Sequence, residues 1–294
     1  MEQFAGRIAV VTGGGSGMGR ELVRQLASAG AHVALCDLSV DTMEETRELA
    51  LADAPDVRIT THRCDVADEE SVQAFRDAVV EQHETDRIHL LFNNAGIGGG
   101  GSMFTSTREA FDRCFAICWG GVYNCTRAFL DLLVAAEEGH IVNTSSVNGF
   151  WASLGPDRPH VAYSAAKFAV KGFSEALITD LRINAPHVKV SVVMPGHIGT
   201  SIVENSIKHG AEKLTDDEMA MMKAASQMFR EAAPTSAAQA AGIMIDGVRT
   251  ERWRILVGDD AHVIDELVRE SPGDAYEPSF VARLQERGVF GAIT

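Results

Sequence analysis

Short apolar runs alternate with amphipathic stretches from residue 7 to about residue 258 of this 294-residue chain. A continuous apolar run of strand length is typical of a parallel strand that is buried on both faces. After the first run, Met18, Leu22, Leu26 and Ala29 recur at helical spacings of three and four. Strand and helix signals that alternate in this way predict a doubly wound α/β domain with a parallel sheet. Strands are expected over residues 8–11, 32–36, 88–92, 140–145 and 254–257, the last being the seventh of the sheet.

A glycine-rich turn joins the first expected strand to the first expected helix. It contains Gly13, Ser16, Gly17, Met18 and Gly19. Backbone N–H groups converge at such a turn, and the dipole of the helix that follows favours an anion. An ordinary glycine-rich loop would also fit these residues taken alone. The strand before the turn and the helix after it favour a site for the phosphates of a dinucleotide.

The second expected strand ends at Asp37, eighteen residues after Gly19. A carboxylate at this place in a nucleotide-binding fold accepts hydrogen bonds from the adenosine ribose. It also repels a 2′-phosphate, and neither Ser16 nor a nearby arginine is expected to compensate. We therefore predict NAD, with NADP less favoured. Asp37 could instead cap the next helix, but Ser39 and Asp41 are better placed for that role.

Tyr163 and Lys167 are separated by four residues of an expected helix, which places both side chains on one face. A fixed ammonium favours the phenolate. Lowering the tyrosine pKa by about three units requires roughly 4 kcal/mol. One cation about 4 Å away, at an effective dielectric constant of ~20, supplies about that much. Tyr163 is therefore a candidate general acid/base near neutral pH.

The sequence contains six short motifs in a characteristic order. Each motif lies at the end of an expected strand or on the helix that follows it. From about residue 4 to residue 258 the chain resembles the short-chain dehydrogenase/reductase family. This resemblance implies a single Rossmann domain over residues 1–294, with a seven-stranded parallel sheet and helices on both faces. The motifs are Thr12-Gly13-x-x-x-Gly17-x-Gly19, Asp65 followed by Val66, Asn93-Asn94-Ala95-Gly96, Ser146, Tyr163 with Lys167, and Pro195-Gly196-His197-Ile198-Gly199-Thr200.

The resemblance also implies the chemistry and its residues. Tyr163 exchanges a proton with the substrate, Lys167 lowers its pKa and holds the nicotinamide ribose, and Ser146 polarises the substrate oxygen. Ser145 is the neighbouring alternative to Ser146. The cofactor accepts or supplies the hydride. The implied reaction therefore interconverts a secondary alcohol and the corresponding ketone. The implied cofactor-binding residues are Gly13, Ser16, Gly17, Met18, Gly19, Asp37, Asp65, Val66, Asn93, Ala95, Gly96, Tyr163, Lys167, Pro195, Gly196, Ile198 and Thr200.

Two features depart from the family pattern. Ser146 and Tyr163 lie 17 residues apart, which is longer than usual, so residues 152–159 are expected to loop out beside the active site. Cys118 occupies the position where many relatives have an asparagine that links the lysine to solvent through water. A thiol is a weak hydrogen-bonding group, and Asn124 is expected to face elsewhere. This leaves a second hypothesis, a catalytically silent dinucleotide-binding protein that senses redox state.

Residues 200–233 form an insertion with several large flexible side chains, namely Met219, Met221, Met222, Met228 and Phe229. Methionine adapts to irregular apolar shapes, so the insertion is expected to be a helical lid over a hydrophobic alcohol or ketone. Helices packed permanently on the body are the alternative. A helix is expected over residues 234–249. In the C-terminal extension, residues 259–294, a helix over 262–269 precedes a tail that is expected to reach a neighbouring subunit.

The family resemblance implies a homodimer or homotetramer built on two long helices, residues 107–136 and 162–184. Phe168, Val170, Phe173 and Leu177 make the second helix more apolar than one intrachain face requires. Burial against the sheet is the competing explanation.

Composition narrows the classes further. A net charge of −15 disfavours nucleic acid and anionic membranes as partners, and no apolar run has membrane-spanning length. No signal peptide is expected, because the first strand follows almost at once. An odd number of cysteines, five, without C-x-x-C spacing fits the cytoplasm. Cys114, Cys118 and Cys125 share a helical stripe with phenylalanines, which favours buried core thiols over a metal site.

Overall fold

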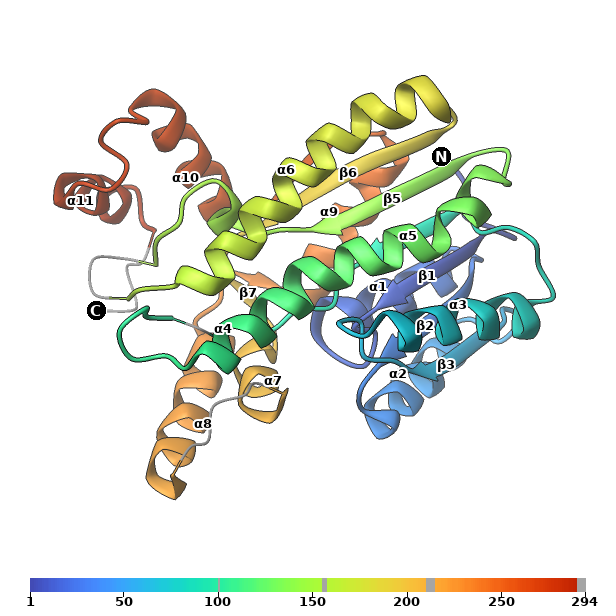
Figure 1. Cartoon of the computed structure of the whole chain (residues 1–294), viewed down its shortest axis with the longest axis horizontal. Coiled ribbons are helices and arrows are strands. Elements are labelled where there is room, and N and C mark those ends of the chain that lie inside the picture. The colour runs from blue at the N-terminus through green and yellow to red at the C-terminus, as the bar shows by residue number, and fades with distance from the viewer. Residues whose placement is uncertain (100, 155–157, 210–214, 290–294) are drawn as a thin grey trace.

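Seven parallel strands form the central sheet of the described chain, which comprises residues 1–99, 101–154, 158–209 and 215–289 of a computed structural model (Figure 1). Both neighbours of β1 follow later in the chain, so the strand order reverses between β1 and β4. In such sheets ligands bind at the carboxyl ends beside this reversal. The predicted seven-stranded Rossmann sheet is confirmed. The strand order is β3 (Ile59–Arg63), β2 (His32–Asp37), β1 (Ile8–Thr12), β4 (Leu90–Asn93), β5 (Gly139–Thr144), β6 (Val188–Pro195) and β9 (Arg254–Val257).

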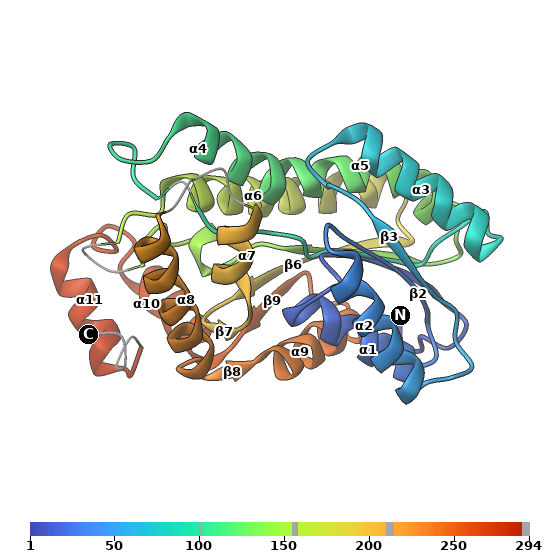
Figure 2. The ribbon, with the colours of Figure 1, turned by 90° about the horizontal axis from the view of Figure 1, so that it is seen from below.

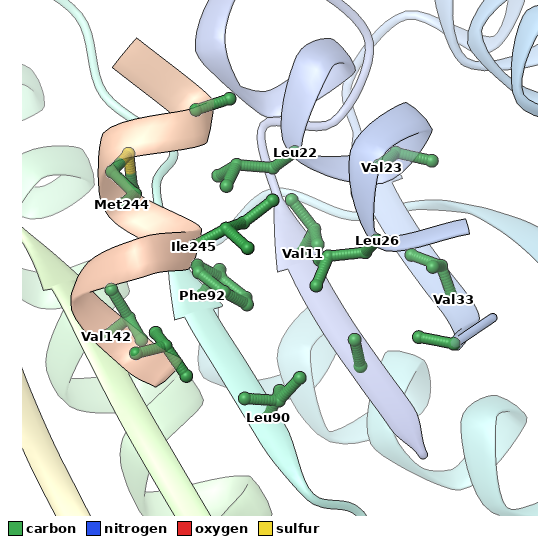
Figure 3. Packing of buried hydrophobic residues seen from close by; sticks show 14 of the residues in the cluster. Val11, Leu22, Val23, Leu26, Val33, Leu90, Phe92, Val142, Met244 and Ile245 are labelled. Atoms are coloured by element: carbon green, nitrogen blue, oxygen red, sulfur yellow. The ribbon is translucent and has the colours of Figure 1, made fainter. Parts of the chain in front are cut away.

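Helices cover both faces of the sheet (Figure 2). On one face lie α1 (Gly17–Ser28), α2 (Val40–Asp53) and α9 (Ala237–Arg249), and on the other lie α3 (Glu69–His83), α5 (Gly121–Val134) and α6 (Val161–Asn184). Figure 3 shows Val11 of β1 and Phe92 of β4 packed against Leu26 of α1 and Ile245 of α9. The opposite face buries its own cluster, which includes Phe129. Because β1 is covered on both sides, its residues are apolar without alternation.

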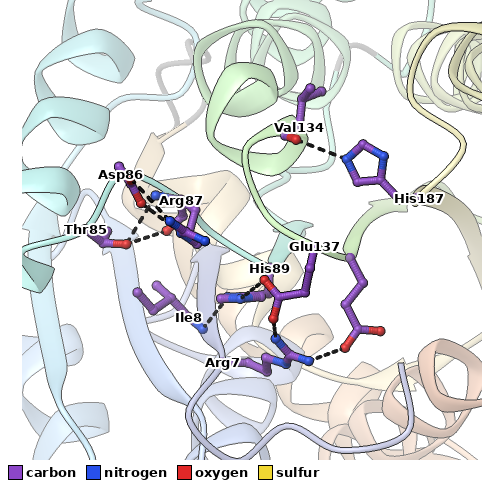
Figure 4. Close-up of polar contacts among 10 residues, drawn as sticks. Arg7, Ile8, Thr85, Asp86, Arg87, His89, Val134, Glu137 and His187 are labelled. Atoms are coloured by element: carbon purple, nitrogen blue, oxygen red, sulfur yellow. Dashed lines mark hydrogen bonds and ion pairs between the residues drawn. The ribbon is translucent and has the colours of Figure 1, made fainter.

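The amino ends of the strands are joined by polar contacts (Figure 4). The backbone N–H of Ile8 donates to Nδ1 of His89 (3.1 Å), and Nε2 of His89 lies 3.7 Å from the Glu137 carboxylate. Arg7 pairs with the same carboxylate. These contacts hold together the segments that lead into β1, β4 and β5. The opposite, carboxyl ends of these strands carry the glycine turn and the other motifs.

Element boundaries differ from the expected ones for local reasons. The strand expected over 88–92 begins at Leu90, because the Ile88 N–H donates to the Leu132 carbonyl and not to a neighbouring strand. Helix α9 begins at Ala237 after a capping box made by Ser236 and Gln239. Helix α10 (Asp259–Glu270) begins three residues earlier than expected, directly after Gly258 in a left-handed conformation.

Further helices lie beyond the carboxyl ends of the strands. They are α4 (Arg108–Phe115), α7 (Ile202–His209), α8 (Asp216–Glu231), α10 and α11 (Pro278–Glu286), with a short ladder of β7 (Ile198–Gly199) and β8 (Thr235–Ser236). The insertion at 200–233 thus contains helices, as predicted, although residues 210–214 lie outside the described residues. None of the described helices combines the length and the apolar character that a membrane crossing requires.

The C-terminal extension packs against its own chain. The indole N–H of Trp151 donates to the Ala275 carbonyl (2.7 Å), and the Trp151 ring lies 5.7 Å from that of Phe280. The backbone N–H of Ala152 donates to the Tyr276 hydroxyl (3.1 Å). A contact with a neighbouring subunit is therefore not needed to bury these side chains. Residues 155–157 and 290–294, which belong to the expected loop and tail, lie outside the described residues.

Candidate active site

The glycine turn packs closely against the loop that follows β4. Gly13 and Gly17 have φ angles of +67° and +54°, which side chains rarely adopt. A Cβ atom at Gly13 would lie 2.9 Å from Cα of Ala95, and one at Gly19 would lie 2.0 Å from the Gly13 carbonyl oxygen. The Ser16 side chain does not cap helix α1. The first N–H groups of this helix are therefore left for a ligand, and the turn fits the phosphates of a dinucleotide.

Asp37 is held in place at the end of β2. Its Oδ2 accepts from the Gly15 N–H (3.0 Å), and its Oδ1 accepts from the Leu38 N–H (2.7 Å). One arginine does reach this turn: Arg20 donates to the Gly15 carbonyl (2.8 Å) and to Glu45 (2.6 Å). This guanidinium is already engaged. Arg20 was missed because it reaches the turn from helix α1, seventeen residues before Asp37.

Asp65 and Val66 line the same cavity on the other side of β2. Oδ2 of Asp65 lies 2.9 Å from Nη1 of Arg113, and Oδ1 accepts from the Ala67 N–H (3.0 Å). The Asn124 amide donates to the Val66 carbonyl (3.0 Å). Arg113 and Asn124 thus position the predicted pair from α4 and α5, a contact between distant segments that motif spacing does not indicate.

A cavity of about 410 Å³ opens at the carboxyl ends of the strands and brings most of the predicted residues together. Its walls include Gly13, Ser16, Gly17, Met18, Asp37, Asp65, Val66, Ala95, Gly96, Ser146, Tyr163, Lys167, Pro195, Gly196, Ile198 and Thr200. Gly19 is not in its walls and instead allows helix α1 to approach the turn.

Asn93 is the other predicted residue that does not line the cavity. Its amide points into the protein and donates to Asn143 (2.8 Å) and to Thr126 (3.1 Å). Asn94 lines the cavity instead, and its amide donates to the Thr12 carbonyl (3.2 Å). Successive residues of a strand face opposite sides, so a motif with two adjacent asparagines does not reveal which one faces the ligand.

The three predicted catalytic residues are buried close to one another. Ser146 and Tyr163 share a hydrogen bond. The Ser146 oxygen also accepts from the Asn148 N–H (3.1 Å). Ser145, the alternative serine, donates to the Lys167 carbonyl (2.7 Å) and so has a structural role. The geometry therefore favours Ser146 as the serine that meets a substrate oxygen.

Burial raises the pKa of the Tyr163 phenol above its ordinary value, and the hydrogen bond with Ser146 opposes this only in part. Lys167 was expected to lower this pKa, but the pKa of the buried phenol is raised. The lysine ammonium donates to the Thr144 carbonyl (2.8 Å) and lies 5.4 Å from the centre of the tyrosine ring. The loss of water around the phenol outweighs a charge at that place. At neutral pH Tyr163 carries its proton.

Cys118 lies in a π-helical turn, Ala116–Gly120, between α4 and α5. Its thiol donates to the Ile97 carbonyl (3.1 Å), and the Cys114 thiol lies 3.8 Å from the same oxygen. Both thiols are fully buried, as is Cys125 in the core beneath α5. Within the described residues, no group of three or more histidine, cysteine or acidic side chains could hold a metal ion.

Helix α7 lies across the cavity and contacts two loops. The Ser206 hydroxyl accepts from the Gly98 N–H (2.7 Å), and the Asn205 amide donates to the Ser16 hydroxyl (3.2 Å). From α8, Phe229 lines the cavity, whereas Met221 and Met228 are 74% and 68% exposed. None of the four methionines is in the cavity wall, so the expectation that they contact the substrate does not match this arrangement.

Comparisons with known proteins identify the family of the chain. A family model described as short chain dehydrogenase matches residues 7–211. A Mycobacterium tuberculosis protein named as an oxidoreductase, SadH, is 37% identical over 290 residues, which cover 98% of this chain and 97% of SadH. Levodione reductase of Leifsonia aquatica is 34% identical over 207 residues, which cover 70% of this chain and 74% of that enzyme.

Two solved structures carry different cofactors. A Burkholderia phymatum short-chain dehydrogenase/reductase in complex with NAD has a TM-score of 0.82 and 29% identity, and the match covers 95% of this chain and 98% of that one. A metagenomic short-chain oxidoreductase in complex with NADP has a TM-score of 0.58 and 32% identity, and the match covers 66% of this chain and 83% of that one. Family, fold and site lead to one conclusion: the chain belongs to the short-chain dehydrogenase/reductase family of oxidoreductases.

Proposed function

We propose that this protein catalyses the NAD(H)-dependent interconversion of a secondary alcohol and a ketone. The observation that carries the proposal is the buried group of Ser146, Tyr163 and Lys167 beside a cavity that fits a dinucleotide. When bound, the nicotinamide accepts or supplies the hydride. All other steps belong to the chain's own residues.

Each residue of this group has a role that follows from its contacts. The Ser146 oxygen accepts from the Asn148 N–H. Its hydroxyl proton, which is shared with Tyr163, can turn to a substrate oxygen bound beside both residues. Tyr163 is protonated at rest, so it can donate its proton to the oxygen of a ketone that is being reduced. Lys167 has three donors and gives one to Thr144. The remaining donors are available for the nicotinamide ribose.

NAD is the proposed cofactor because Asp37 faces the place of the adenosine ribose with a fixed carboxylate. Its charge opposes a 2′-phosphate. Arg20 is the residue that could favour NADP, but its guanidinium is paired with Glu45.

A hydrophobic substrate is supported by the walls around Tyr163. They include Val147, Trp151, Leu154, Ile202 and Phe229. The name of levodione reductase is consistent with a ketone as substrate for a relative. We propose a small apolar alcohol or ketone, with helix α7 as part of the lid.

Assembly and location complete the proposal. Trp119, Tyr123 and Phe173 form an aromatic cluster on α5, α6 and the π-helical turn, and Tyr123 is 45% exposed. Such a cluster fits a homodimer or homotetramer built on these helices, which sedimentation at micromolar concentration tests. Val170 and Leu177 are instead buried in their own chain.

All five cysteines are unpaired, which fits a location in the cytoplasm.

The deciding experiment is NADH appearance with a panel of secondary alcohols, using wild type and Tyr163→Phe. Turnover that requires Tyr163 supports the proposal. Tight NADH binding without turnover on any alcohol or ketone would favour the silent dinucleotide-binding protein.

A further inference from the structure

His160 lies three residues before Tyr163, at the position that precedes the first turn of α6, and it lines the cavity. Its ring centre is 4.6 Å from that of Tyr163, and the ring planes are tilted by 36°. An imidazole is therefore placed directly beside the phenol that exchanges the proton.

The polar atoms of His160 have no role in holding the fold. Its side chain does not cap helix α6. Within the described part of the chain, neither ring nitrogen has a hydrogen-bond partner. Other polar side chains of the cavity are used: the Asn148 amide donates to the Trp151 carbonyl (3.1 Å), and Nε2 of His197 is 2.7 Å from the Phe229 carbonyl.

The imidazole is neutral under ordinary conditions, because burial lowers the pKa of His160 to about 4. A neutral imidazole offers one N–H donor and one acceptor. These stand in a wall that is otherwise formed largely by apolar side chains, such as Val147 and Leu154. His160 is only partly buried, so its ring nitrogens are accessible and can pair with a ligand that enters the cavity.

A purely supporting role for His160 would need only its ring. Stacking against Tyr163 uses the flat faces, and phenylalanine would provide the same contact. The nitrogens therefore require a separate explanation.

We infer that His160 is a substrate-binding residue, and that the substrate carries a second, uncharged oxygen function besides the reacting one. This rests on the proposed alcohol–ketone function. Substrates of this class are hydroxyketones, diketones and the corresponding diols. A neutral imidazole does not favour a carboxylate, and the net charge of −15 also disfavours an anion. Arg158 also lines the cavity, so a carboxylate substrate is the alternative to test.

The experiment compares ketones that are matched in size. The hydroxycyclohexanones with the second oxygen at position 2, 3 or 4 are paired with the corresponding methylcyclohexanones, and 2-oxocyclohexanecarboxylate is added. Each is measured with wild type, His160→Phe and His160→Gln. His187→Phe is the control, because this histidine lies near the amino ends of the strands, far from the cavity.

For wild type and the control we expect one hydroxy compound to exceed its methyl partner about tenfold in kcat/KM, as one hydrogen bond provides. His160→Phe should remove this preference through KM and leave the methyl compound within about twofold. His160→Gln should retain part of it. Three results would overturn the inference. The preference for the hydroxy compound could persist in His160→Phe, or kcat/KM could fall equally for both members of every pair. Wild type could also prefer 2-oxocyclohexanecarboxylate.

Failure of the proposed function is a separate outcome. If wild type turns over none of these ketones, the same pairs are titrated by calorimetry into the NAD-saturated protein. Tighter binding of a hydroxy compound that is lost in His160→Phe supports the inference, and equal binding of all pairs contradicts it.

Discussion

Lys167 places its ammonium 5.4 Å from the centre of the Tyr163 ring, one helical turn away, and both side chains are almost completely buried. The lysine is held there by the Thr144 carbonyl, which ends β5. The sheet therefore sets the position of the charge, and the helix sets the position of the phenol.

Replacing the phenol should separate chemistry from binding. Tyr163→Phe removes the transferable proton and keeps the ring, so kcat should fall at least about a hundredfold. NADH affinity should stay within about twofold. Lys167→Ala should lower both kcat and NADH affinity, since the Lys167 ammonium is proposed to hold the nicotinamide ribose as well. Steady-state kinetics and NADH fluorescence titration measure the two effects, and a near-normal kcat in Tyr163→Phe would end this mechanism.

The direction of the reaction should depend on pH in a defined sense. Because burial raises the pKa of Tyr163, the phenol is protonated at neutral pH. Ketone reduction uses this form, so its rate should be level through neutral pH and fall in alkali. Alcohol oxidation needs the deprotonated form, so its rate should rise with pH. Initial rates in both directions between pH 6 and pH 10 check this, and an oxidation rate that falls with pH contradicts it.

Cofactor choice should depend on the Asp37 carboxylate. We expect wild type to bind NADH at least about tenfold more tightly than NADPH, because a fixed negative charge opposes the 2′-phosphate. Asp37→Asn keeps the size and removes the charge, so it should narrow this difference, and Asp37→Ala should narrow it too. Nicotinamide fluorescence titration gives both affinities. Equal affinities in wild type would refute the role of Asp37.

Acid should destabilise the fold through His140. This side chain is 1% exposed, and Nε2 lies 2.7 Å from the Ser191 hydroxyl. Burial lowers the pKa of His140 to about 3, below the unfolded value of about 6.5. The unfolded chain therefore takes up a proton first as the pH falls. The contribution of neutral His140 to the free energy of unfolding should be fully present above about pH 6.5. Between pH 6.5 and pH 3 it should decrease by up to roughly 1.4 kcal/mol per pH unit.

Urea unfolding at pH 7.5, 5.5 and 4.5 measures this slope. His140→Gln cannot take up the proton, so its stability should depend less on pH, although it starts lower. Replacement of the more accessible His187 by glutamine serves as the control. An unchanged slope in His140→Gln would exclude His140 as the source.

Helix α7 should respond to ligands if it acts as a lid. Its contacts through Asn205 and Ser206 are two hydrogen bonds to loops, whereas a core helix has a continuous apolar face. Hydrogen exchange in Ile202–His209 should be fast in the free enzyme and slow with NAD and a substrate analogue. Ser206→Ala should speed exchange in both states. Full protection in the free enzyme would favour permanent packing.

The strands and the dinucleotide site could be predicted because their signals are local. A buried strand needs a continuous apolar run, and the glycine turn needs residues without Cβ, so both are visible in a few neighbouring positions. The direction of the two asparagines, Asn93 and Asn94, could not be predicted, because it depends on the phase of the strand. The place of Arg20 and the pKa of Tyr163 depend on what distant segments bring into contact. The methionines of α8 were misplaced because an apolar pattern does not specify what it packs against.

The bond between Trp151 and Ala275 has a consequence for synthesis of the chain. The strands β1 to β6 and the loop that carries Ser146 and Trp151 are synthesised before residue 275, so the bond to the Ala275 carbonyl can form only after them. For the same reason, truncation before Ala275 would leave the indole N–H without its acceptor, at a cost of roughly 1–3 kcal/mol if it stays buried. The cavity wall that Trp151 forms is therefore completed late in the synthesis of the chain.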